Sequence, residues 1–273
     1  QLASPVAPAG TITAYFVERY GFSPQCVVNV GSGDNPQSKV MLDGDLLSLG
    51  SSFVYMVDTG EPVVDMQGYA NSMYDGLGRP FVFACRTNGA MVWDRLRSAA
   101  GADYERADAA LAAADPGDRV EIWQPYAESY PVAPPIANTA AGASAAAGEF
   151  DTLYPAVVDS ALVLTRHYAR GFERGGGTLA VTGGPTASDE IVRRVAAVFE
   201  RPVTVVGSSG AALGSALSAW QTLCDTRGRD AELARVRREL APPGEVVEPD
   251  DDLVRAYATA APRIVAAFEE AVK

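Results

Sequence analysis

The sequence predicts an α/β fold in which helices flank a mixed β-sheet. Two observations carry this prediction: residues 45–49 and 53–58 have the pattern of paired antiparallel strands, and strand and helix patterns alternate from residue 179 onward. A chain of 273 residues, 48% of them hydrophobic and 21% charged, is sufficient for a substantial core. At ~150 residues per domain, this length allows one large or two modest domains.

The chain carries a strongly negative charge. It has 34 acidic residues against 22 Lys and Arg, which gives a net charge of −12 at pH 7 and would repel a nucleic acid. Neither an export signal nor an uninterrupted apolar run of ~18 residues is visible. Three scattered cysteines, Cys26, Cys85 and Cys224, favour a reducing compartment. We therefore expect a cytoplasmic protein without nucleic-acid or membrane partners.

The first elements are a helix and a strand. Apolar residues recur every three to four positions over 11–20, which predicts a helix with one apolar face. This face consists of Ile12, Tyr15, Phe16 and Tyr20. The apolar run 26–30 predicts a buried strand that ends in a Gly-Ser-Gly-Asp turn at 31–34.

The middle of the chain predicts a strand meander and then helices. A small-residue turn at Gly50, Ser51 and Ser52 joins the strands 45–49 and 53–58, and residues 62–66 predict a further strand. Residues 89–101, 103–114 and 155–171 have helical patterns, and Pro155 is well tolerated in a first helical turn. The Pro- and Ala-rich stretch 131–148 predicts a surface excursion.

The last third has the most regular pattern. A strand at 179–182, a turn at 183–185, a helix at 188–199, a strand at 203–206 and a helix from 211 follow one another. Such a β-α-β-α unit requires a parallel crossover, with helices that cover the sheet. The tail predicts one more helix, or two that are interrupted at Pro262.

A meander followed by α/β crossovers suggests the actin-like ATPase layout, and several motifs narrow this suggestion. The chain resembles the second domain of the FGGY carbohydrate kinases, and its Gly-Asp-Asn is most similar to that of the xylulokinases. The motifs are GSGDNP at 31–36, LLSLGSS at 46–52, WQPYAES at 123–129, YPAVVDSALVL at 154–164, TGGPTAS at 182–188, GAALGSALSAW at 210–220 and VEPDDDLVRAY at 247–257. They occur in the family's order and cover nearly the whole chain.

This resemblance implies a ribonuclease H-like (actin-like ATPase) fold and an ATP-dependent sugar kinase. The chain would transfer the γ-phosphoryl group of ATP to a hydroxyl of a pentulose, D-xylulose above all, with Mg²⁺ bridging the phosphates. Residues 1–273 would form only the C-terminal, nucleotide-binding domain, because the N-terminal sugar-binding half of the kinase is absent from them. We therefore expect the isolated chain to be inactive and the missing half to be its partner.

Asp34 is the predicted catalytic residue. It lies where a strand pattern ends and a short helix begins, and a helix N-terminus favours an ionised carboxylate. By resemblance, Asp34 is the general base for the sugar hydroxyl, and Asp34 and Asn35 contact the substrate. Without the resemblance, an ordinary helix cap is the more frequent role for such an aspartate.

Glycine-rich turns are the predicted nucleotide contacts. By resemblance, Gly50 and Ser51 hold the β- and γ-phosphates, and Gly183, Gly184 and Ser188 hold the adenosine. Exposed backbone amides at such turns bind anions, although a simple hairpin turn has the same pattern. Asn88, which precedes the Trp93 helix, resembles a residue of the nucleotide cleft. No metal ligand is predicted from this half.

Other interpretations of the sequence stay open. The chain is either part of a kinase or a non-catalytic nucleotide-binding or interaction module, and a related kinase for glycerol, ribulose or gluconate is a third reading. His167, the only histidine, lies in a helix pattern where a structural role is expected. Glu128 is left without a role, and the oligomeric state is open, a homodimer included.

Overall fold

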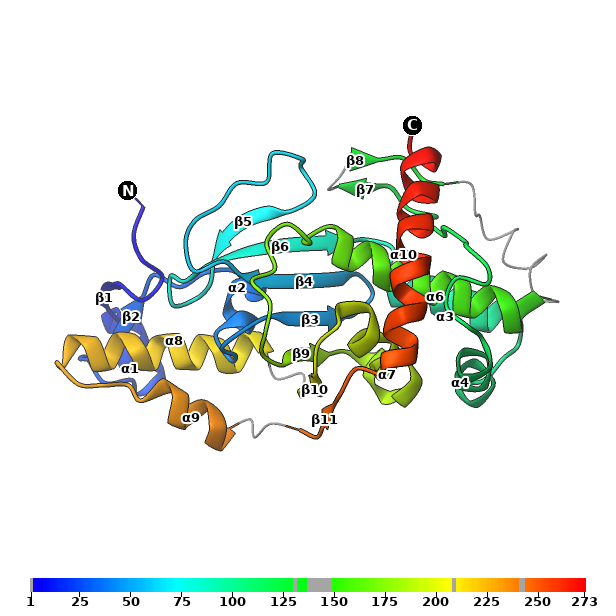
Figure 1. Cartoon of the computed structure of the whole chain (residues 1–273). Helices are drawn as coiled ribbons and strands as arrows, with labels where there is room; N and C mark the ends of the chain where they lie inside the picture. The colour runs from blue at the N-terminus through cyan, green and yellow to red at the C-terminus, as the bar shows by residue number, and fades with distance from the viewer. Residues whose placement is uncertain (1, 130–131, 137–148, 208–209, 241–243) are drawn as a thin grey trace.

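A computed structural model describes residues 2–129, 132–136, 149–207, 210–240 and 244–273 (Figure 1). Its centre is a seven-stranded sheet with the strand order β11-β10-β9-β3-β4-β6-β5. The strands are β3 (Leu46–Leu49), β4 (Phe53–Asp58), β5 (Asn71–Tyr74), β6 (Pro80–Arg86), β9 (Leu179–Thr182), β10 (Val203–Val205) and β11 (Val246–Val247). Strands β3, β9 and β10 run parallel, whereas the other neighbours pair antiparallel, so the sheet is mixed as predicted.

Side chains alternate along the strands between two apolar clusters, one on each face of the sheet. On one face, Leu47, Tyr55 and Val181 join a large core with five helices. These helices are α3 (Ala90–Ala99), α4 (Tyr104–Ala113), α6 (Phe150–His167), α7 (Asp189–Phe199) and α10 (Asp251–Ala271). On the other face, Leu46 and Met56 belong to a smaller cluster.

Helix α6 is the centre of the large core. Nearly every residue of this 18-residue helix is buried, and Val158 and Leu162 are completely inaccessible. A helix that is apolar around most of its circumference is stable only when it is surrounded, and α3, α4, α7 and α10 all pack against it. The predicted tail helix is a single one, α10, with Pro262 inside it.

Three further helices form an apolar cluster apart from this core. They are α2 (Asp34–Lys39), α8 (Gly210–Thr226) and α9 (Leu233–Leu240). Helices α2 and α8 approach each other so closely that a Cβ on Gly214 would lie 1.8 Å from the Gln37 carbonyl oxygen. A short pair of strands, β7 (Glu128–Ser129) and β8 (Val132–Ala133), is separate from the sheet. No helix in the described part of the chain is long and apolar enough to cross a membrane.

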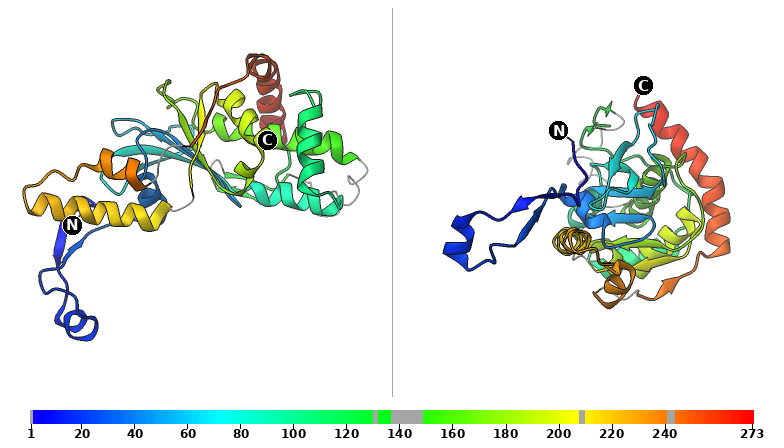
Figure 2. Two further views of the ribbon diagram at one scale, coloured as in Figure 1. Left: turned by 90° about the horizontal axis from the view of Figure 1, so that it is seen from below. Right: turned by 90° about the vertical axis from the view of Figure 1, so that its left-hand side faces the viewer.

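Residues near the N-terminus form an arm that extends away from the sheet (Figure 2). The arm consists of β1 (Pro8–Thr11), α1 (Ala14–Tyr20) and β2 (Val27–Asn29). The predicted helix exists, but none of its residues is buried. The prediction of a buried strand at 26–30 is wrong: β2 pairs with β1 alone, and Val28 and Val30 are nearly half exposed.

The predicted strand at 62–66 is also wrong, because β6 and β5 continue the meander. Asp65 explains the error. Its carboxylate accepts hydrogen bonds from the backbone N–H groups of Gln67, Tyr69 and Ala70, so a local turn forms in place of a strand. Most of the predicted surface excursion at 131–148 lies outside the described residues.

Candidate functional site

Two of the predicted glycine turns lie side by side. Strands β3 and β9 are parallel neighbours, with Ser48 paired to Thr182, so the turns that follow them leave the same edge of the sheet. Gly183 has a φ of +115°, and a Cβ there would lie 2.1 Å from the Leu49 carbonyl oxygen. Only glycine allows this backbone conformation and this close approach.

A cavity of about 360 Å³ lies on one side of this turn. Gly184 and Ser188, both predicted site residues, line it together with helices α3, α4 and α6. Its other prominent side chains are Trp93, Asp94, Tyr104, Asp108 and Tyr154. A Cβ on Gly184 would meet nothing within 4 Å, so this glycine opens onto free space.

Some polar groups around this cavity are hydrogen-bonded within the fold, and others are not. The Ser188 hydroxyl donates to Asp108 at 2.6 Å and caps α7 by accepting the Ile191 N–H at 3.1 Å. Burial, with the charges of Asp108 and Asp94, raises the pKa of Tyr154 above its ordinary value, so the phenol stays a donor. The buried Trp93 indole N–H has no hydrogen-bond partner among the described residues. A flat apolar ring with polar edges fits such a site.

A second, smaller cavity of about 220 Å³ lies on the other side of the turn. Asn35 and Gly183 line it, with Ser48 and Thr182 on the sheet and Gly210 at the start of α8. The buried Thr182 hydroxyl oxygen lacks a partner in the described part of the chain. The turn at Gly183 and Gly184 therefore lies between two cavities.

Asp34 occupies the first turn of α2 with an exposed carboxylate. Its Oδ1 accepts the N–H of Asn35 at 2.8 Å. The N-cap position is occupied by Gly33 and not by Asp34, so Asp34 is not the capping residue of α2. Asn35 reaches the smaller cavity, whereas Asp34 does not belong to its lining. An exposed carboxylate beside this cavity remains free to meet an incoming hydroxyl group.

The predicted phosphate turn, Gly50–Ser52, is outside both cavities but contacts the wall of the larger one. The Gly50 carbonyl accepts the N–H of Ala90, a residue that lines the larger of the two. Ser51 is exposed. Asn88 is different: its side chain is buried and makes hydrogen bonds to Tyr126 and Glu128.

Sequence reasoning missed most of the side chains around the larger cavity. These side chains come from the consecutive helices α3 and α4 and from the distant helix α6, and each has the pattern of an ordinary helical residue. They are Trp93, Tyr104, Asp108 and Tyr154. The one available signal was Trp93, a large aromatic residue with a donor that needs a partner when it is buried.

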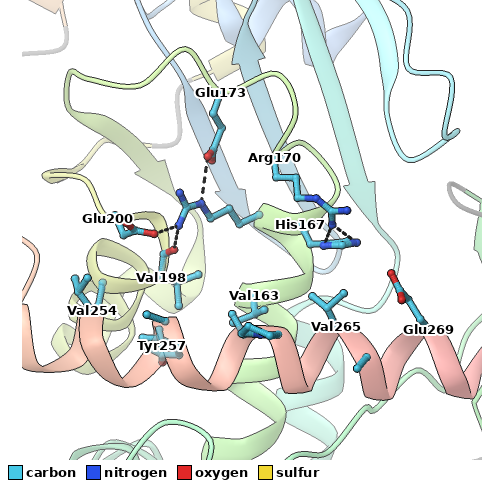
Figure 3. Close-up of a pocket in the computed structure, with 16 residues that line it drawn as sticks. Val163, His167, Arg170, Glu173, Val198, Glu200, Val254, Tyr257, Val265 and Glu269 are labelled. Carbon is cyan, nitrogen blue, oxygen red and sulfur yellow. Dashed lines mark hydrogen bonds and ion pairs between the residues drawn. The ribbon is translucent and has the colours of Figure 1, made fainter.

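A third cavity, of about 600 Å³, contains none of the predicted residues (Figure 3). It lies between α10 and the C-terminal ends of α6 and α7. Arg166 there donates to Glu173, to Glu200 and to the Val198 carbonyl, so its charge is compensated within the fold. His167 contacts Arg170 and, edge to face, Tyr69. These contacts agree with the structural role expected for this histidine.

The described residues offer no ready-made metal centre. No three His, Cys, Asp or Glu side chains among them converge in a way that could hold a metal ion. Cys26, Cys85 and Cys224 are all free thiols.

No family model matches the chain, but individual proteins do. Xylulose kinase from Mus musculus is 26% identical over 279 residues, which cover 96% of this chain and 50% of that protein. The Rattus norvegicus xylulose kinase gives the same identity, with 96% and 52% coverage. Xylulose kinase 2 from Arabidopsis thaliana is 28% identical, with 84% and 45% coverage. The chain thus spans about half the length of the curated relatives it matches.

Solved structures share the fold of the whole chain. Xylulose kinase from Rhodospirillum rubrum has a TM-score of 0.79 at 19% identity and covers 98% of this chain and 56% of its own. Gluconate kinase from Lactobacillus acidophilus has a TM-score of 0.79 at 18% identity, with 99% and 57% coverage. Glycerol kinase from Plasmodium falciparum, solved with ADP, has a TM-score of 0.68 at 16% identity, with 99% and 56% coverage. The predicted actin-like fold and the resemblance to xylulose kinases are confirmed.

Proposed function

We propose that this chain is the nucleotide-binding half of an ATP-dependent sugar kinase with a pentulose, D-xylulose first, as its acceptor. The observation that carries this proposal is the turn at Gly183 and Gly184, which lies between an aromatic cavity and the smaller cavity beside Asn35, and which touches the end of β3. The adenine ring occupies the aromatic cavity, and the phosphates pass the turn toward the smaller one. The similarity to xylulose kinases over 96% of the chain supports the assignment.

All the predicted nucleotide contacts except Asn88, whose side chain is buried and bonded to Tyr126 and Glu128, have a place in this scheme. Gly184 and Ser188 hold the adenosine, and the indole N–H of Trp93 supplies a donor to a base nitrogen. Gly183 and Ser51 present a backbone amide and a hydroxyl to the phosphates, and Gly50, whose N–H donates to the Ser52 carbonyl at 3.2 Å, shapes the turn that holds Ser51. When bound, Mg²⁺ neutralises charge that develops on the transferred group. Since the described residues lack a converging ligand set, we assign most of its protein ligation to the other half.

Asp34 is the proposed general base. Its exposed carboxylate accepts the proton of the sugar hydroxyl and orients this hydroxyl toward the γ-phosphate, while Asn35 holds the sugar from the neighbouring cavity wall. Phosphoryl transfer has a loose transition state, so orientation supplies much of the value of this base.

The arm supports the proposal that residues 1–273 form the C-terminal domain of a larger kinase. A two-stranded hairpin and a helix without buried residues are marginal by themselves in water. Its aromatic side chains are exposed, and the relatives are twice as long as this chain. We therefore propose that the arm packs against the N-terminal half, which contributes the rest of the sugar site.

Titration of the purified chain with Mg·ADP, followed by calorimetry, tests the nucleotide site. Binding is expected for the unaltered chain, and Gly184→Val should weaken it at least about tenfold, because a branched side chain would fill space that the adenosine needs. Gly171→Val, at an exposed position with nothing within 4 Å of its Cβ position and without a positive φ, is the control. If a folded Gly184→Val variant binds ADP with unchanged affinity, the adenosine assignment is wrong.

A non-catalytic nucleotide-binding module is the second candidate, because the chain covers only half of its relatives. Assay of the kinase assembled from both halves separates the two candidates. Phosphorylation of D-xylulose supports the kinase, and ADP binding without turnover on any sugar supports the module. Glycerol, ribulose and gluconate belong in the same panel, since kinases for glycerol and gluconate share the fold.

A further inference from the structure

Glu128 is a buried carboxylate outside both cavities of the proposed site. Its side chain is fully inaccessible. One carboxylate oxygen accepts the Thr87 N–H at 2.6 Å, and the other accepts the Asn88 N–H at 3.1 Å and the Asn88 side-chain amide at 2.5 Å. Arg86, the nearest cation, is 3.9 Å away. A buried carboxylate costs free energy unless its hydrogen bonds are made. Movement of the groups that donate to Glu128 would break these bonds, so Glu128 holds the donors in place.

What Glu128 fixes is the segment between β6 and α3. The Asn88 side chain completes the attachment, because its Oδ1 accepts the Tyr126 N–H at 3.0 Å and its Nδ2 donates to the Tyr126 carbonyl at 2.9 Å. Both backbone amides and the side chain of this segment are therefore tied to residues 126–128. The segment has no freedom to shift along the sheet edge.

The same segment forms the seat of the Gly50–Ser52 turn. Ala90, the first residue of α3, donates its N–H to the Gly50 carbonyl at 3.0 Å, and Ser52 donates its hydroxyl to the Thr87 carbonyl at 3.5 Å. Gly89 lies so close that a Cβ on it would be 2.6 Å from the Ser51 carbonyl oxygen. The turn is thus held from behind along its whole length.

We infer that Glu128 is a positioning residue that fixes the Gly50–Ser52 turn for phosphate binding by clamping Thr87 and Asn88. This inference rests on the proposed function, since it takes the turn to be the phosphate site. Glu128 acts through the backbone and does not touch the nucleotide. Amides that are held in place before the anion arrives bind it without paying an ordering cost. The role also accounts for Asn88, whose side chain belongs to the clamp.

The test compares ADP with adenosine, because only ADP carries phosphates. Glu128→Gln places an NH₂ group against backbone donors and removes the charge opposite Arg86. Outer-shell groups of this kind change affinity about tenfold or more, so we expect at least a tenfold weaker Kd for ADP and an unchanged Kd for adenosine. Asp45→Asn is the matched control. Asp45 is also buried, accepts the Asp58 N–H at 2.8 Å and pairs with Arg201. It lies just before β3, at the end of this strand opposite to the Gly50–Ser52 turn.

Gly89→Ala gives a second route to the same answer if Glu128→Gln folds poorly. A methyl group at this position would lie 2.6 Å from the Ser51 carbonyl oxygen and 2.8 Å from the Ser52 Cα, so the turn itself must shift to accommodate it. A selective loss of ADP affinity is expected here too. The inference is overturned if Gly89→Ala and Glu128→Gln leave ADP binding intact, or if they weaken ADP and adenosine equally, as a general loss of structure would. An unaltered chain that binds neither ligand would refute the nucleotide site itself, and the positioning role with it.

Discussion

Helices α1 and α6 are both apolar, yet their surroundings are opposite. In α6, Val158 and Leu162 are completely buried among other helices. In α1, Tyr15, Phe16 and Tyr20 are between 41% and 59% exposed and contact mainly one another. Hydrophobic periodicity reveals a helix and its apolar face, but it says nothing about what covers that face. In this chain the sheet domain supplies its own cover, whereas the arm does not.

This difference divides the proposed roles as well. The sheet domain, with its covered core, carries the stability and the nucleotide cavity. We call the arm and the adjoining helix α2 the open side of the chain. In our proposal, the general base and the missing half of the kinase meet there. Variants in the two regions should therefore affect different measurements.

Asp34→Ala tests the open side and has the largest expected effect. In the assembled kinase, loss of a general base should lower kcat by about 10²–10⁴-fold. The carboxylate is exposed and, among the described residues, it accepts hydrogen bonds from Asn35, so the free energy of unfolding should change by no more than about 0.5 kcal/mol. Steady-state kinetics and urea unfolding measure the two quantities. Asp251→Ala, at an equally exposed first-turn aspartate of α10, is the control, and near-normal turnover of Asp34→Ala would reject Asp34 as the base.

Phe53→Ala tests the core of the sheet domain. Phe53 is inaccessible and packs edge to face against Trp93, with ring centroids 4.8 Å apart. Removing a buried aromatic ring costs about 3–5 kcal/mol of unfolding free energy. Urea unfolding of Phe16→Ala in α1, the same substitution at a 41% exposed position, should show a loss several times smaller. Equal losses at the two positions would mean that α1 is covered in solution.

The sequence predicts the features that depend on local residues. The β9, α7, β10 and α8 succession was predictable because each element follows the last through a short connection. The conformation at Gly183 was suggested by its glycine pair, whose backbone freedom is a local property. By contrast, Trp93, Asp108 and Tyr154 meet only through the packing of α3, α4 and α6, which no local pattern encodes. In our proposal, the missing half of the kinase covers β2 and α1. Local sequence therefore could not predict that these elements are exposed in this chain.

Replacement of Tyr15, Phe16 and Tyr20 together by glutamine should have the smallest effect on this chain. Glutamine is a good helix former, and exposed substitutions usually change the unfolding free energy by about 0.5 kcal/mol or less each. In the assembled kinase, the same three rings would lie in an interface, where buried aromatic side chains contribute strongly.

The decisive quantity is therefore the difference between two melting temperatures. We expect the glutamine variant to melt near the unaltered protein when this chain is measured, and well below it when the assembled kinase is measured. Leu240→Gln, an exposed apolar position at the end of α9, serves as the control in both backgrounds. If the arm variant shifts both melting temperatures equally, the arm does not pack against the other half. An uncovered aromatic face would then be a property of the complete protein, and the contrast between α1 and α6 would have another cause.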